Sequence, residues 1–112
     1  MRYAVPVSGG VMAAHFGHCE HFALIDVNEE NREIVRKELV TPPGHEPGLL
    51  PQWLAEQGAS VVIATGMGSR AQGLFQQNCI QVVIGTLESD PEKAVMDYLN
   101  GTLSTGDNIC DH

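Results

Sequence analysis

Apolar residues recur along the chain in five short runs, and three further segments carry them at helical spacing. Runs of four to eight apolar or alternating residues that end at polar or glycine-containing turns are typical of strands. The predicted strands are residues 3–7, 22–27, 33–39, 60–64 and 81–84. The predicted helices are residues 49–57, 70–77 and 91–99, with Ser89 or Asp90 available to cap the last one.

The order of these segments predicts the topology of the sheet. Only the polar residues 28–31 separate the second and third strands, so we expect an antiparallel hairpin, with the second strand also antiparallel to the first. After the hairpin, strands alternate with helices, which is typical of parallel strands covered on both faces. We therefore predict an α/β fold with a five-stranded mixed sheet, in which the first, fourth and fifth strands are parallel. Residues 1–103 form the predicted domain and residues 104–112 a C-terminal tail.

Composition excludes several classes of function. The chain has 112 residues, 43% of them hydrophobic, which suits one compact domain. A formal net charge of −8 disfavours binding to nucleic acid and to anionic membranes. No apolar run approaches the roughly 20 residues of a membrane-spanning helix, and the first residues are predicted to be a strand, not a signal peptide. We expect a cytoplasmic protein.

The three cysteines, Cys19, Cys79 and Cys110, are far apart and form no CxxC pair. Neither a disulfide framework nor a four-cysteine zinc site is therefore predicted. Cys79 lies among apolar neighbours, and we predict that it is an inert, buried thiol.

Metal-ligating side chains are concentrated in residues 15–21, shortly after a Ser-Gly-Gly turn. Three imidazoles and one thiol occur there, and both groups bind the softer transition metals. Their spacing matches no zinc-finger pattern, and an ordinary polar loop is the alternative. The candidate metal ligands are His15, His18, Cys19 and His21, with Cys110 and His112 as further candidates in a tail that can equally be disordered.

A glycine-containing turn, residues 64–71, joins the fourth predicted strand to the second predicted helix. Free backbone N–H groups at a helix start favour an anion, and Arg70 adds a planar cation. The turn lacks the third glycine of a dinucleotide-binding fingerprint. The alternative is that Gly66 and Gly68 only permit a tight turn. No converging carboxylates or nucleophile–base pair can be identified, so catalysis is not predicted.

Three segments occur in a distinctive order and spacing. They are residues 5–8 with 15–26, which include His15-Phe16-Gly17; residues 44–54, which include His45; and residues 62–71 continued through Phe75 to 82–85. Together they resemble the dinitrogenase iron-molybdenum cofactor biosynthesis family over roughly residues 1–103. The family includes NifX-type carriers, C-terminal domains of NifB-type assembly proteins and the orange proteins of sulfate-reducing bacteria, which hold a molybdenum-copper sulfide cluster. The resemblance implies a ribonuclease H-like three-layer fold without nuclease activity.

The resemblance also implies a cofactor site. His15 corresponds to the histidine of the family's His-Phe-Gly element, and residues 66–70 correspond to its second cofactor-facing loop. The expected cofactor-binding residues are Ser8, Gly9, Gly10, His15, Phe16, Gly17, His45, Thr65, Gly66, Met67, Gly68, Ser69 and Arg70. Because ligands of such sheets bind beyond the carboxyl ends of parallel strands, we expect His15, His18, Cys19 and His45 to converge there with the turn of residues 66–70, on one solvent-accessible face.

Two hypotheses on function follow. The first is a non-catalytic carrier for a metal-sulfur cluster, either an iron-molybdenum cofactor precursor or a molybdenum-copper sulfide. The second is a scaffold or regulatory module whose partner is a protein such as a cluster-assembly ATPase. A metal-dependent nuclease is disfavoured because the carboxylates that would hold Mg²⁺ are missing.

Overall fold

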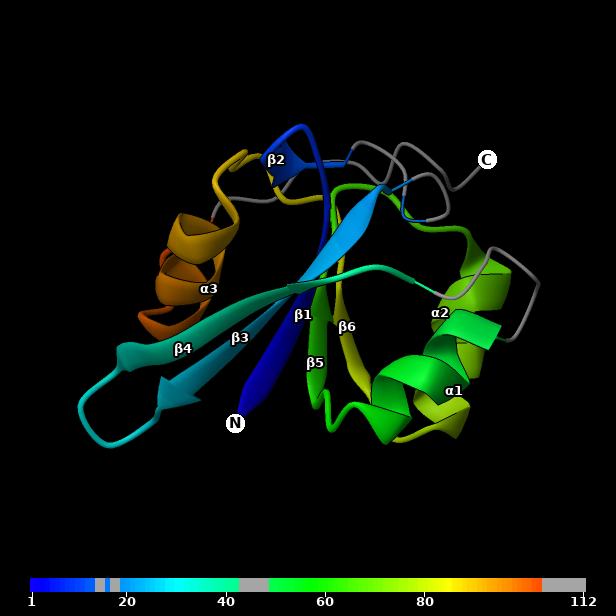
Figure 1. Cartoon of the computed structure of the whole chain (residues 1–112), viewed down its shortest axis with the longest axis horizontal. Coiled ribbons are helices and arrows are strands. Elements are labelled where there is room, and N and C mark those ends of the chain that lie inside the picture. The colour runs from blue at the N-terminus through cyan, green and yellow to red at the C-terminus, as the bar shows by residue number, and fades with distance from the viewer. Residues whose placement is uncertain (14–15, 17–18, 43–48, 104–112) are drawn as a thin grey trace.

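The computed structural model describes residues 1–13, 16, 19–42 and 49–103, so the predicted tail lies outside the described residues. Its centre is a six-stranded mixed sheet with the strand order β4-β3-β1-β5-β6, to which β2 is added by pairing with β1 (Figure 1). The strands are β1 (Arg2–Ser8), β2 (Val11–Met12), β3 (His21–Asn28), β4 (Glu33–Val40), β5 (Val61–Ile63) and β6 (Gln81–Val83). The helices are α1 (Leu49–Glu56), α2 (Ser69–Gln77) and α3 (Pro91–Leu99).

The strand pairing confirms the predicted topology. β1 is antiparallel to β3 and parallel to β5, β3 forms the hairpin with β4, and β5 is parallel to β6. The predicted count of five strands is wrong, because β2 adds a sixth. Gly9 and Gly10 both have positive φ, 63° and 84°, which a tight two-residue hairpin turn requires. The chain therefore turns back at once and pairs Val11 and Met12 with the end of β1.

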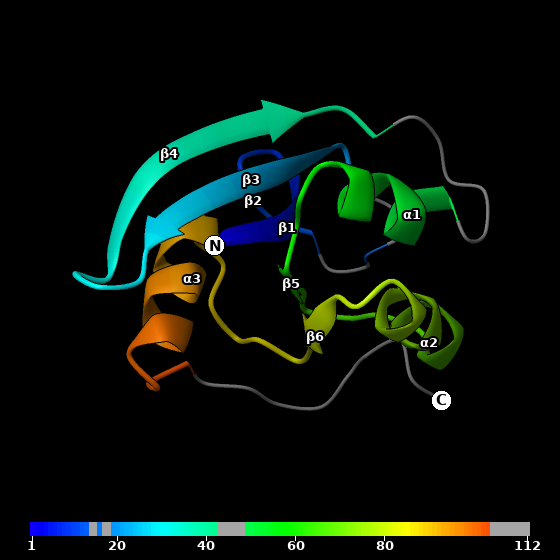
Figure 2. The same ribbon diagram turned by 90° about the horizontal axis from the view of Figure 1, so that it is seen from below.

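Helices cover both faces of the sheet. Side chains alternate along β1, so that Ala4 joins one hydrophobic core while Tyr3 and Val5 join the other. The first core also contains apolar residues of α1 and α2, and the second contains Ala94 and Val95 of α3. Figure 2 shows this arrangement, with α3 on one side of the sheet and the other two helices on the opposite side. Among the described residues, no helix is long and apolar enough to cross a membrane.

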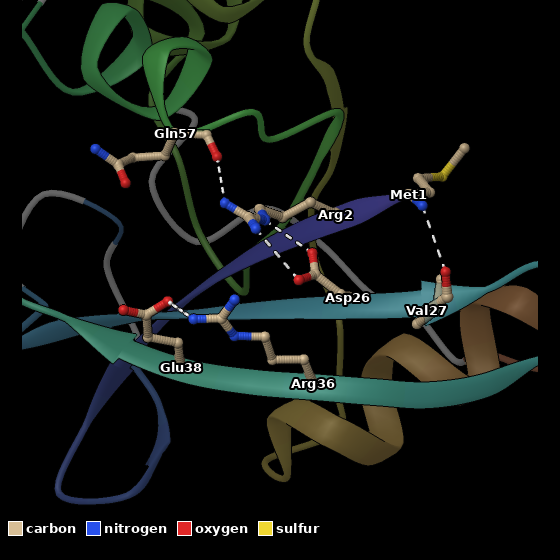
Figure 3. Close-up of polar contacts among 7 residues, drawn as sticks. All are labelled: Met1, Arg2, Asp26, Val27, Arg36, Glu38 and Gln57. Atoms are coloured by element: carbon tan, nitrogen blue, oxygen red, sulfur yellow. Dashed lines mark hydrogen bonds and ion pairs between the residues drawn. The ribbon is translucent and has the colours of Figure 1, made fainter.

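A polar cluster ties β1 to its neighbours at the end of the sheet where β1 begins (Figure 3). The guanidinium of Arg2 donates to both carboxylate oxygens of Asp26 on β3, at 2.8 and 3.2 Å, and also to the carbonyl of Gln57 after α1. These bonds hold the pKa of Asp26 below its usual range. On β4, Arg36 and Glu38 form a second, more exposed ion pair at 3.2 Å.

Cys79 is exposed, so the prediction of a buried thiol is wrong. It follows α2 with a positive φ of 61°. Its N–H donates to the carbonyl of Gln76, and the N–H of Ile80 donates to that of Phe75, both at 3.0 Å. This is the Schellman arrangement of a helix C-terminus, in which the left-handed residue faces solvent and the next apolar residue returns to the core. Ile80 and Phe75 accordingly share one core.

Candidate functional site

Two segments that are far apart in sequence meet where β1 and β5 end. The N–H of Phe16 donates to the carbonyl of Gly66 over 2.9 Å, which joins the predicted His-Phe-Gly loop to the glycine-containing turn. Because β1 and β5 are parallel, their carboxyl ends lie at the same edge of the sheet. The structure therefore brings Phe16 and Gly66 together at this edge. The expectations for His15, Gly17, His18 and His45 concern residues outside those described.

Phe16 anchors this loop in the core. Its side chain is 7% exposed and packs edge-on against the rings of Phe75, at 5.2 Å, and Phe22, at 5.7 Å. The ring is thus enclosed by protein, and its contribution at the edge of the site is the backbone N–H. Phe16 therefore packs in the core and does not present its ring to a ligand.

The carbonyl groups of the glycine-containing turn are all engaged within the protein. Each of the five consecutive carbonyls of residues 64–68 accepts a hydrogen bond. In chain order, the donors are the N–H of Thr86 (3.4 Å), of Gly85 (2.9 Å) and of Phe16 (2.9 Å), the side-chain amide of Gln72 (3.0 Å) and the N–H of Gln72 (3.1 Å). The negative ends of these peptide dipoles are therefore directed into the protein.

The N–H groups at the start of α2 differ from these carbonyls, because they are not bonded to an acceptor in the described part of the chain. Gly68 precedes α2 without a side-chain cap, and the first turn of α2 has no acidic residue. In the described part of the chain, no acceptor contacts the N–H groups of residues 68–71. Ser69 and Arg70 are exposed. Uncapped N–H groups at a helix start carry a partial positive charge and bind anions.

Arg70 adds a full positive charge at this position. The chain has six Lys and Arg residues, and the other five each contact a partner. These contacts are Arg2 with Asp26, Arg32 with Asn100, Arg36 with Glu38, Lys37 with Glu92, and Lys93 with Glu88. Arg70 has no such partner within residues 1–13, 16, 19–42 and 49–103. Its guanidinium is therefore available to a ligand.

The other expected cofactor contacts differ in how open they are. Ser8 ends β1, and its hydroxyl accepts the N–H of Glu20 over 3.1 Å, while Gly9 and Gly10 are exposed in the hairpin turn. Thr65 is half-buried. Met67 is 1% exposed, so its side chain belongs to the core and holds the turn against it.

Two predicted metal ligands lie within the described residues. Cys19 is 3% exposed, and burial raises the pKa of its thiol to about 11. The expectation that Cys19 lies on a solvent-accessible face is therefore wrong, because its side chain belongs to the same core as Phe16 and Phe22. The ring of His21 is half-buried, and its Nδ1 lies 3.5 Å from the hydroxyl of Thr41. The described residues contain no group of three His, Cys, Asp or Glu side chains that could hold a metal ion; the candidates His15, His18, Cys110 and His112 lie outside them.

The structure also has an open depression of about 590 Å³ that is unrelated to this site. It is lined by Met1, Val27, Asn28, Glu29, Glu30 and Ser60. These residues lie where β1 begins and β3 ends, at the opposite end of the sheet from the glycine-containing turn. Two glutamates there repel anions, so we assign the candidate site to the turn.

The chain is similar to known proteins in sequence and in fold. A family model for the dinitrogenase iron-molybdenum cofactor matches residues 1–101. The uncharacterized protein MJ0580 of Methanocaldococcus jannaschii is 30% identical over 108 residues, which cover 92% of this chain and 89% of that protein. The crystal structure of PH0822 has a TM-score of 0.85 at 27% identity, with 95% and 96% of the two chains covered. The apo form of the orange protein from Desulfovibrio gigas has a TM-score of 0.74 at 25% identity, covering 96% and 93%.

Proposed function

The chain belongs to the dinitrogenase iron-molybdenum cofactor family, and we propose on this premise that it is a non-catalytic carrier of a metal-sulfur cluster. The proposed cargo is an iron-molybdenum cofactor precursor or a molybdenum-copper sulfide. The assignment of the fold to the ribonuclease H-like class is part of the same proposal.

The observation that carries the proposal is the polarity of the glycine-containing turn. Five consecutive carbonyls are bonded inside the protein, whereas the N–H groups of residues 68–71 and the guanidinium of Arg70 have no partner in the described chain. A chain with a net charge of −8 repels an anion at long range, so only local donors can hold one. Sulfides at the surface of an anionic cluster would accept hydrogen bonds from these donors.

We propose His15 as the second contact, because it directly precedes Phe16, whose N–H is bonded to Gly66 of the turn. His18, His21 and His45 are proposed as further contacts, and Cys110 and His112 as contacts from the tail. For Cys19, burial in the hydrophobic core supports a packing role, and Cys19→Ser is expected to retain the cluster.

Anaerobic titration of the apo protein with tetrathiomolybdate and Cu(I), followed by the charge-transfer absorption, tests the proposal. His15→Ala should weaken retention about tenfold or more, the effect of losing a bond or a charge-assisted hydrogen bond. Arg70→Ala should weaken it roughly threefold and reduce its dependence on salt, because an exposed cation acts through a screened charge.

Arg32→Ala is the matched control, since it removes one positive charge from the β3–β4 turn at the opposite end of the sheet. It should leave retention unchanged. Equal retention by the wild type, His15→Ala and Arg70→Ala would contradict the proposed site.

A further inference from the structure

Gln72 contacts the glycine-containing turn through two of its groups. Its backbone N–H donates to the carbonyl of Gly68 over 3.1 Å, as the first hydrogen bond of α2. Its side-chain amide Nε2 donates to the carbonyl of Met67 over 3.0 Å. The side chain is half-buried, so this second bond is partly shielded from water.

The bond to Met67 determines the direction of a neighbouring donor. The carbonyl of Met67 and the N–H of Gly68 belong to one planar trans peptide unit, in which the two groups point in opposite directions. When the amide of Gln72 binds the carbonyl, the N–H of Gly68 must point away from Gln72. If this peptide unit rotated, the carbonyl of Met67 would point where the N–H of Gly68 now points, so an acceptor would replace the donor.

Such a rotation is sterically possible in this sequence. The rotation changes φ of Gly68, and glycine adopts backbone conformations that other residues avoid. The Met67 side chain packs in the core, so the peptide unit after it joins a buried residue to a glycine. A carbonyl that faced an anionic cluster would repel it.

We infer that Gln72 is a positioning residue, which fixes the Met67–Gly68 peptide so that the N–H of Gly68 serves the anion site. The inference rests on the proposed function for its ligand, but the orientation of the peptide can be measured in the apo protein. Gln72 itself need not touch the cargo.

Three variants on α2 test the role. Gln72→Met removes the donor while keeping side-chain length and helix propensity. Gln72→Glu keeps the shape, but offers a carboxylate that cannot donate at neutral pH and a carboxyl that can donate once protonated. Gln76→Glu is the matched control, because Gln76 lies one turn further along α2, is exposed and makes no side-chain hydrogen bond within the described residues.

Anaerobic binding of tetrathiomolybdate with Cu(I) at neutral pH is the first measurement. Gln72→Met should bind roughly three- to tenfold more weakly than the wild type, as expected for one hydrogen bond that no longer holds a donor in place. Gln72→Glu should bind more weakly than Gln76→Glu, although both add the same charge to the same helix.

The second measurement is the amide resonance of Gly68 in the apo protein. In Gln72→Glu it should shift from the wild-type position at neutral pH and return towards it as the introduced carboxyl is protonated, near pH 4 to 5. In Gln76→Glu it should stay close to wild type throughout. A purely stabilising role for Gln72 would lower the melting temperature without this titration.

These measurements distinguish the proposed carrier function from the positioning role of Gln72. If wild-type protein fails to bind tetrathiomolybdate with Cu(I) while the Gly68 resonance titrates as described, the molybdenum-copper sulfide cargo is wrong and the role of Gln72 stands. If the wild type binds but Gln72→Met binds equally well, or if the Gly68 resonance does not respond to Gln72→Glu, the inference on Gln72 is overturned.

Discussion

At the scale of single residues, Cys79 occupies a backbone conformation that glycine adopts more easily. Its φ of 61° brings the side chain against its own carbonyl, at a cost of about 1–2 kcal/mol for residues other than glycine. Replacing Cys79 by glycine would remove this cost, but glycine loses more conformational entropy on folding, which offsets part of the gain in stability. We expect Cys79→Gly to raise the free energy of unfolding by roughly 0.5–1 kcal/mol in urea denaturation. Cys79→Ala keeps the Cβ atom, so an equal gain from alanine would show that the backbone is not the cause.

At the scale of elements, the bond between Arg2 and Asp26 links β1 to β3, and Arg2 also reaches the end of α1. Hydrogen bonding from Arg2 lowers the pKa of Asp26 in the folded protein. Its contribution to stability is therefore fully present above the usual aspartate pKa of about 3.9 and is lost as the pH falls through the lower folded value.

Asp26→Asn should accordingly reduce stability by about 1 kcal/mol at pH 7, a modest figure because both side chains are partly exposed. The difference from wild type should shrink as the pH is lowered below 4, as measured by thermal unfolding over a pH series. Glu38→Gln, in the more exposed pair with Arg36, should change stability little at any pH. A constant difference between Asp26→Asn and wild type over the whole pH range would contradict this assignment.

At the scale of the whole molecule, β4 is an eight-residue edge strand that carries two exposed apolar side chains, Val35 (62% exposed) and Leu39 (57%). Open edges of this kind pair readily with other chains. Two features oppose such pairing here. Arg36, Lys37 and Glu38 place charges in the middle of the strand, and the register shift opposite Asp26 and Val27 breaks the regular ladder.

Replacing these three charged residues by threonine should therefore promote self-association, visible as a concentration-dependent rise in sedimentation coefficient. The matched control replaces Glu29, Arg32 and Lys93 by threonine, which also removes two cations and one anion but leaves β4 unchanged. Association of the control to the same degree would show that net charge, and not the edge, keeps the chains apart.

The sequence predicted those parts of the molecule that depend on periodic burial. The central strands carry long apolar runs, and Asp90 before Pro91 predicted the start of α3, where its carboxylate accepts the N–H of Glu92 at 3.0 Å. The two-residue strand β2 escaped prediction because it depends on backbone pairing to β1, not on a hydrophobic pattern.

In the candidate site, the turn at Gly66 was predicted, whereas the role of Gln72 was not. A side chain that binds a carbonyl five residues earlier has no composition or spacing that marks it. Cys19 was proposed as a ligand because it lies among histidines, but composition cannot tell which side chains of a segment face the core. The buried position predicted for Cys79 rested on its apolar neighbours in the sequence, which do not indicate the left-handed backbone that turns the thiol outward.

The donors of residues 68–71 belong to the main chain, and this has a consequence for protein engineering. Substitution of a side chain cannot delete a peptide N–H, with proline as the exception. The proposed anion site therefore depends little on the surface side chains around it. An engineer who wished to adapt the scaffold to a different oxyanion or thioanion could keep this turn and Gln72 unchanged, and direct all diversity to the loop that Phe16 anchors.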